Sequence, residues 1–105
     1  TTTHADCIAW YQSLAQSAPK MVRIDSVGMT DSGRPLHRVI ISTGGFDSAT
    51  VRNNQRAVVF INNGIHPGEP EGIDASMQLA RDLVSRPVYR DLLRQLTVVI
   101  VPIYN

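Results

Sequence analysis

Residues 58–72 read VVFINNGIHPGEPEG, and this stretch decides how the rest of the chain is interpreted. It starts as an apolar run and continues into one histidine and two glutamates set among prolines and glycines. A second apolar run, LTVVIVPI, occupies residues 96–103. Nearly continuous apolar runs are typical of strands that are covered on both faces of a sheet. The sequence therefore predicts two buried strands, at 57–61 and 96–103.

A helix is predicted between these two strands. Apolar residues recur there at helical intervals, opposite a set of charged residues, and the apolar set is Ile73, Met77, Ala80, Leu83 and Val84. The pattern predicts a helix over 70–85, with Pro70 suited to its first turn, and a short helical piece after Pro87. A strand, a helix and a second strand in this order indicate a right-handed βαβ unit with parallel strands.

The first half of the chain has a different pattern. Residues 4–17 form a predicted amphipathic helix, in which Cys7 is interpreted as a small core residue rather than a nucleophile. Two alternating segments, 21–29 and 35–42, flank the turn-forming residues TDSGR and predict an antiparallel hairpin that belongs to the same sheet. Residues 43–56 are rich in Gly, Ser and Asn and are predicted to be a loop.

Composition limits the possible partners. The 105 residues are 43% hydrophobic and 18% charged, and the net charge of +1 comes from scattered residues, so we expect no nucleic-acid partner. No apolar stretch approaches the ~20 residues of a membrane span. Two buried parallel strands need neighbours and helices on both faces, which this chain does not supply in full. We therefore expect residues 1–105 to be the N-terminal part of a single larger domain.

His66 and Glu69 are the candidate metal ligands. Ligands in open α/β sheets bind beyond the carboxyl ends of the strands, and the loop 62–70 lies at that position. A spacing of three can bring both side chains to one cation, and an imidazole nitrogen with a carboxylate oxygen suits Zn²⁺. Pro67 and Pro70 restrict the backbone of the loop, which lowers the entropy lost when an ion is held.

The residues alone leave another interpretation open. A His-x-x-Glu spacing occurs often by chance, and Glu69 and Glu71 could simply be favourable charges at a helix N-terminus. For Glu71 this helix-terminus role is the preferred one. His37 lies in the middle of the predicted hairpin and is interpreted as an ordinary strand residue, while His4 lies close to a terminus expected to fray.

Several motifs taken together resemble one known family. VVFINNGIHPGEPEG, followed by an amphipathic helix and then LTVVIVPIYN, resembles the metal-binding core of the zinc carboxypeptidase family, the carboxypeptidase A/B-like metallopeptidases. The segment VGMTDSGRPLHRVIIS resembles the hairpin that precedes that core, so the resemblance spans residues 5–105. It implies a three-layer α/β/α sandwich on a mixed, mostly parallel sheet.

The resemblance also implies a chemistry. Zinc would be held by His66, Glu69 and a second histidine further along the polypeptide, and a zinc-bound water would attack a peptide or related amide bond. The general-base glutamate would also lie downstream, so we expect no catalytic residue within this chain. Activity would then require the remainder of its own catalytic domain.

One position departs from the family's pattern. Digestive members carry an arginine directly before the ligand glutamate, where it contacts the peptide substrate, whereas this chain has Gly68. The difference leaves room for a relative that acts on other amides, such as an N-acyl amino acid deacylase or a cell-wall peptide hydrolase. A non-catalytic, metallopeptidase-like binding module is the alternative from a different functional class.

Overall fold

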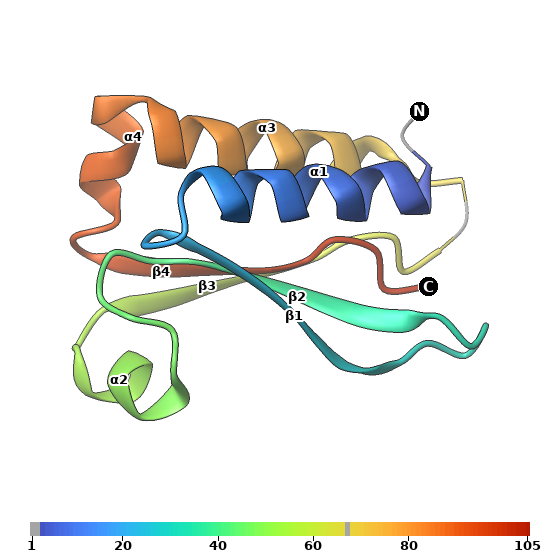
Figure 1. Ribbon diagram of the computed structural model, residues 1–105, viewed down its shortest axis with the longest axis horizontal. Helices are drawn as coiled ribbons and strands as arrows, with labels where there is room; N and C mark the ends of the chain where they lie inside the picture. The colour runs from blue at the N-terminus through green and yellow to red at the C-terminus, as the bar shows by residue number, and fades with distance from the viewer. Residues whose placement is uncertain (1–2, 67) are drawn as a thin grey trace.

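The computed structural model describes residues 3–66 and 68–105. Helices and strands follow one another along the chain (Figure 1) in the order α1 (His4–Ser17), β1 (Val22–Met29), β2 (Pro35–Ile41), α2 (Ser48–Asn53), β3 (Ala57–Asn62), α3 (Glu71–Ser85), α4 (Pro87–Leu92) and β4 (Leu96–Val101). No helix within these residues is long and apolar enough to span a membrane. The predicted helices at 4–17 and 70–85 are thus confirmed almost to the residue.

The strands form one mixed sheet in the order β1-β2-β4-β3. β1 and β2 make the predicted antiparallel hairpin, and β2 pairs antiparallel with β4. β3 and β4 are parallel from Ala57 opposite Leu96 to Asn62 opposite Val101, so the predicted βαβ unit is confirmed. Among these strands one pairing in three is parallel, so the expected parallel majority is not found here. The reason is that β2 is antiparallel to both of its neighbours, β1 and β4.

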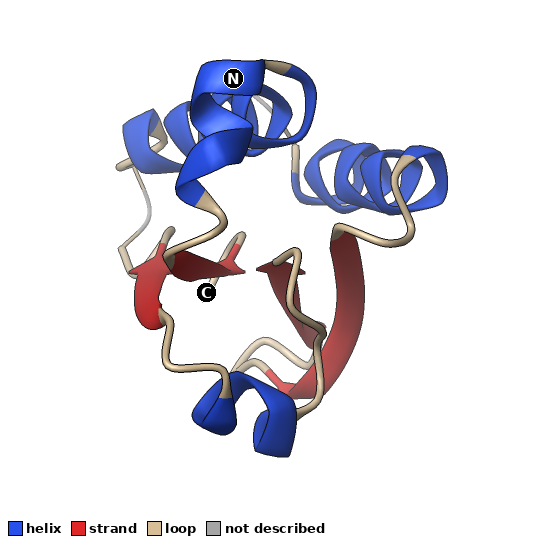
Figure 2. Cartoon of the chain, turned by 90° about the vertical axis from the view of Figure 1, so that its left-hand side faces the viewer, coloured by secondary structure: helices blue, strands red, loops and turns tan. Residues whose placement is uncertain are grey.

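The helices cover the two faces of the sheet unequally. α1, α3 and α4 lie on one face, and the short α2 lies on the other, as Figures 1 and 2 show. The main core lies beneath the larger helical layer, and its buried members are Cys7, Tyr11, Val22, Val39, Ile41, Ala80, Leu83, Leu93, Val98 and Ile100. Three layers are present, but within the described residues the third consists of α2 alone.

The prediction of a strand covered on both faces is wrong for β3. This strand is at the edge of the sheet, and Phe60 and Val58 are 61% and 52% exposed. By contrast, β4 lies between two strands and its residues Val98 and Ile100 are buried. Apolar sequence shows that a strand is suited to burial, but neighbouring elements are needed to achieve it.

We expect the isolated chain to self-associate through β3. An edge strand offers unpaired backbone N–H and C=O groups, and β3 carries no charge or proline to prevent pairing with a second copy. Phe60→Lys should therefore shift residues 1–105 toward the monomer in analytical ultracentrifugation at about 100 μM. Val88→Lys is the matched control, because Val88 is 80% exposed and lies on α4 rather than on a strand. Equal association of the wild type and Phe60→Lys would contradict the expectation.

The prediction of an uninterrupted loop over 43–56 is also wrong, because it contains α2. Asp47 caps this helix: its Oδ1 accepts from the backbone N–H of Thr50 at 2.9 Å, and its Oδ2 accepts from the Thr50 hydroxyl at 2.7 Å. These hydrogen bonds to Thr50 lower the pKa of the Asp47 carboxyl. A helix of six residues is too short to produce a clear apolar period, so its only sequence signal was the cap.

Cys7 is a core residue, as predicted. Its side chain is fully buried on α1. Burial, together with the negative charge of Asp74, raises the pKa of the thiol from 9.0 to about 11. The thiol is therefore protonated and shielded in the folded chain, which is the opposite of a reactive nucleophile.

The shift of Cys7 predicts an alkaline loss of stability. The unfolded chain releases the thiol proton near pH 9, whereas the folded chain retains it to about pH 11. Stability should thus fall as the pH rises through this window, because the unfolded state binds fewer protons there. Urea unfolding of the chain between pH 8 and pH 11, about the span of this window, measures the slope. Cys7→Ala should flatten it up to about pH 10, above which the pKa of Tyr11, also raised by burial, adds a slope of its own. An unchanged slope below pH 10 in that variant would contradict the assignment.

Candidate metal centre

His66 and Glu69 lie on the loop that joins β3 to α3, at the carboxyl end of β3. Figure 1 places this loop at the same end of the sheet as the end of β4 and the C-terminus of the chain. His66 Nδ1 and Glu69 Oε1 are 3.2 Å apart, and their side chains are 72% and 65% exposed. The sequence spacing thus does bring the two side chains together, and both are open to solvent.

This pair fits a zinc ion. Nitrogen and oxygen ligands lie about 2.0–2.2 Å from zinc, so two of them in tetrahedral geometry are roughly 3.4 Å from each other. The observed 3.2 Å between Nδ1 and Oε1 is close to that separation. One imidazole and one carboxylate are also the donor types that catalytic zinc sites use. The two side chains therefore fit two adjacent positions around one ion.

The segment after β4 holds the first part of the loop. The backbone N–H of Tyr104 donates to Asn63 O at 2.7 Å, and that of Asn105 donates to Gly64 O at 3.1 Å. The Asn105 side chain adds a bond from its Nδ2 to Ile65 O, at 3.3 Å. The three carbonyl groups that precede His66 are thus all hydrogen-bonded, and the histidine extends from a supported backbone.

Two glycines of the loop have a left-handed backbone conformation. Gly64 has φ +68° and Gly68 has φ +84°, a region that other residues adopt only with strain. At Gly64 a Cβ would also lie 3.1 Å from Ile103 Cγ2, so space is limited there. At Gly68 a Cβ would meet no atom within 4 Å. Pro67, to which the sequence assigned a stiffening role, lies outside the described residues.

The other titratable candidates lie elsewhere. His37, on β2, faces His4 at the start of α1, with ring centroids 6.4 Å apart. Burial, followed by the charges of Arg34 and His37, lowers the pKa of His4. Glu71 is in the first turn of α3, which agrees with the predicted helix-terminus role. Across residues 3–66 and 68–105, no three His, Cys, Asp or Glu side chains form a metal-binding group.

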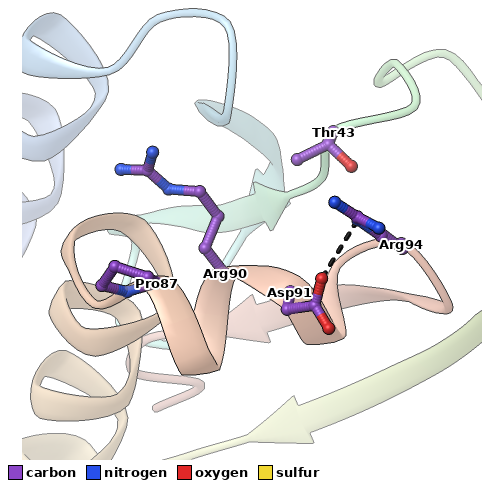
Figure 3. A pocket seen from close by; sticks show the side chains of 5 residues that line it. All are labelled: Thr43, Pro87, Arg90, Asp91 and Arg94. Carbon is purple, nitrogen blue, oxygen red and sulfur yellow. Dashed lines mark ion pairs between the residues drawn. The ribbon is translucent and has the colours of Figure 1, made fainter.

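A pocket of about 300 Å³ lies at the opposite end of the sheet, beside α4 (Figure 3). Its charged groups already have protein partners: Arg94 pairs with Asp91 at 3.1 Å, and the Arg90 guanidinium donates to Val84 O. The Thr43 hydroxyl donates to Leu93 O. These residues hold the ends of α3 and α4, and the pocket is remote from His66 and Glu69.

The sequence resembles known zinc carboxypeptidases along most of its length. The sequence model of the zinc carboxypeptidase family matches residues 7–105. Carboxypeptidase B of Astacus astacus is 26% identical over 98 residues, which cover 92% of this chain and 30% of that protein. Zinc carboxypeptidase A 1 of Drosophila melanogaster is 38% identical over 64 residues, or 61% of this chain and 14% of that protein. The chain thus spans less than a third of either relative.

Solved structures have the same fold. Carboxypeptidase A from Helicoverpa armigera matches with a TM-score of 0.82 and 22% identity, over 97% of this chain and 24% of that one. A metallo-carboxypeptidase from Burkholderia cenocepacia matches with a TM-score of 0.77 and 22% identity, over 97% of this chain and 27% of that one. At these identities the likeness establishes the fold.

The sequence match places this chain in a family of metallopeptidases, and the solved structures share its α/β fold. More narrowly, the chain belongs to the zinc carboxypeptidase family, and the metal of that family is zinc. The expected family, fold and cofactor are therefore confirmed. The loop is also supported by residues that no sequence pattern had indicated, namely Asn63, Tyr104 and Asn105. Their position directly after two parallel strands was the available signal.

Proposed function

We propose that His66 and Glu69 are two of the three protein ligands of a catalytic zinc ion. The separation of 3.2 Å between Nδ1 and Oε1 is the observation that carries this proposal. Two histidines and one glutamate are the ligand set known for carboxypeptidase A, and this pair offers one of each type. A histidine from a part of the protein outside these residues would complete the set.

The proposed enzyme requires the remainder of its domain. The chain matches its relatives over 14% to 30% of their lengths, and its β3 edge is exposed and apolar. Both facts support the view that residues 1–105 are the N-terminal part of one catalytic domain. In this arrangement the chain contributes two metal ligands, while the general base comes from another segment.

The proposed reaction is hydrolysis of a C-terminal peptide bond or a related amide. A bound zinc ion would activate a water molecule and polarise the scissile carbonyl. His66 and Glu69 would hold the ion at the carboxyl end of β3, where ligands of α/β sheets bind. The His66 ring would supply a nitrogen ligand to the ion, and the Glu69 carboxylate would offset part of its positive charge.

Gly68 supports a second candidate substrate class. A residue with no side chain occupies this position, and a Cβ there would meet no atom within 4 Å. The side of the loop next to Glu69 is consequently open, and no arginine contacts an extended peptide at this position. An N-acyl amino acid, which presents one amide and one free carboxylate, needs no such contact, so a deacylase of the same fold is the second candidate.

The test uses the full-length protein with zinc content measured in parallel. We expect about one zinc ion per protein, and release of the last amino acid from a blocked dipeptide that has a free carboxylate. Amidation of that carboxylate should abolish turnover. Cleavage of N-acetyl amino acids in preference to peptides would favour the deacylase, whereas stoichiometric zinc without turnover of either substrate would favour a binding module. A protein that binds no zinc would contradict the proposal.

A further inference from the structure

Asn63 is buried directly after β3, and its side chain crosses to α3. Its Nδ2 donates to the hydroxyl of Ser76 at 2.8 Å, and both residues are almost fully buried. The bond joins positions 13 residues apart in sequence, on the two sides of the metal loop. Within the described residues it is the one hydrogen bond between two buried side chains of β3, the loop and α3.

The amide of Asn63 occupies a notch on α3 formed by small residues. Gly72 and Ser76 are one helical turn apart and therefore lie on the same face of the helix. A Cβ at Gly72 would be 2.7 Å from Asn63 Oδ1, so the amide lies directly against this part of the helix. The side chain of Asn63 thus fits between Gly72 and the hydroxyl of Ser76.

The backbone of Asn63 is fixed as well. Its N–H donates to Val101 O at 3.1 Å, and its carbonyl accepts from the N–H of Tyr104 at 2.7 Å. Asn63 therefore connects β4 and its extension, through the backbone, with α3, through the side chain. The loop that carries both His66 and Glu69 starts at this residue and ends where α3 begins.

We infer that Asn63 is a positioning residue, which through Ser76 sets the distance between the two ends of the loop and so prepares His66 and Glu69 for one metal ion. This inference rests on the proposed zinc site. The side chain does not touch the metal pair but determines how β3 and α3 present it. Direct partners of metal ligands typically change metal affinity about 10-fold to 100-fold, and a support that does not touch the ligands is expected to act at or below the lower end of that range.

The test is a double-mutant cycle in the full-length protein, with zinc titrations and the visible spectrum of the Co²⁺-substituted protein. Asn63→Ala and Ser76→Ala should each weaken zinc binding by roughly threefold to tenfold, at or below the range for direct partners of metal ligands, and alter the Co²⁺ bands. The double variant should be no weaker than either single one, because one bond is lost in every case.

Two further measurements separate positioning from general stability. Ile41→Val removes one buried methyl group from the core, next to the start of β4 and far from the loop. It should lower the unfolding temperature, as Asn63→Ala does, but leave zinc affinity unchanged. In the metal-free protein, the amides of Tyr104 and Asn105 should exchange faster in Asn63→Ala and in Ser76→Ala, but not in Ile41→Val. Zinc affinity within twofold of the wild type in Asn63→Ala, or unchanged exchange, would overturn the inference. Absence of zinc binding by the wild type would instead contradict the proposed zinc site.

Discussion

Alanine at His66 or Glu69 is expected to weaken zinc binding by the full-length protein on the order of a hundredfold or more. Structural zinc sites bind with roughly 10–16 kcal/mol over four ligands, so one ligand is equivalent to about 3 kcal/mol, and 1.4 kcal/mol is a factor of ten. His66 Nδ1 and Glu69 Oε1, at 3.2 Å from each other, would occupy adjacent positions around one ion. Removal of either leaves too few protein ligands to retain it.

The control for this experiment is His37→Ala. His37 is on β2 and faces His4 rather than the metal loop, so its loss should leave zinc affinity nearly unchanged. Calorimetric titration of the three variants and the wild type measures the difference, and metal analysis of the purified proteins checks it independently. If the His66 and Glu69 variants bind zinc as the wild type does, these residues are not metal ligands, and Glu69 is only a favourable charge at the start of a helix.

The second large effect is the absence of peptidase activity from residues 1–105 alone. Within the described residues, no group of three potential ligands exists, so His66 and Glu69 would hold an ion only weakly. A transition state also requires groups that stabilise its charge, and removal of one such group typically costs about a hundredfold to a thousandfold in rate. Because the proposed site takes its third ligand, its base and its carbonyl-polarising groups from outside this chain, we expect no detectable turnover.

Activity of the chain is measured with zinc supplied in excess and with the full-length protein as the positive control. The substrate is a blocked dipeptide with a free carboxylate, and both preparations are assayed with it in the same buffer. A metal chelator should abolish the signal of the full-length protein and leave the background of residues 1–105 unaltered. Zinc-dependent turnover by the short chain would show that it contains a complete site, contrary to this prediction.

The two strongest periodic patterns led to correct elements. The apolar residues of α3 recur at helical intervals, and two of them, Ala80 and Leu83, are buried. A helical period over this length strongly favours a helix. The prediction of a parallel pair from two apolar runs separated by a helix is confirmed in β3 and β4. The short α2 was missed because its stability depends on the Asp47 cap rather than on an apolar face.

The metal pair illustrates what could be derived from neighbouring residues. A spacing of three and the location after a strand indicated that His66 and Glu69 could meet, and their atoms are 3.2 Å apart. Their supports could not be derived in the same way. Asn63 and Ser76 are 13 residues apart, and the bond between them forms only because α3 packs across the end of β3.

The sequence by itself thus determined the local elements, the βαβ order and the identity of the candidate ligands, because these depend on periodicity and short spacing. Only the tertiary structure decided which strand is exposed and what holds the loop. Burial of a strand depends on its neighbours in the sheet, so β3 and β4 have similar apolar sequences but different surroundings. The support of the loop depends on contacts between distant segments, such as Tyr104 with Asn63, which no local pattern encodes.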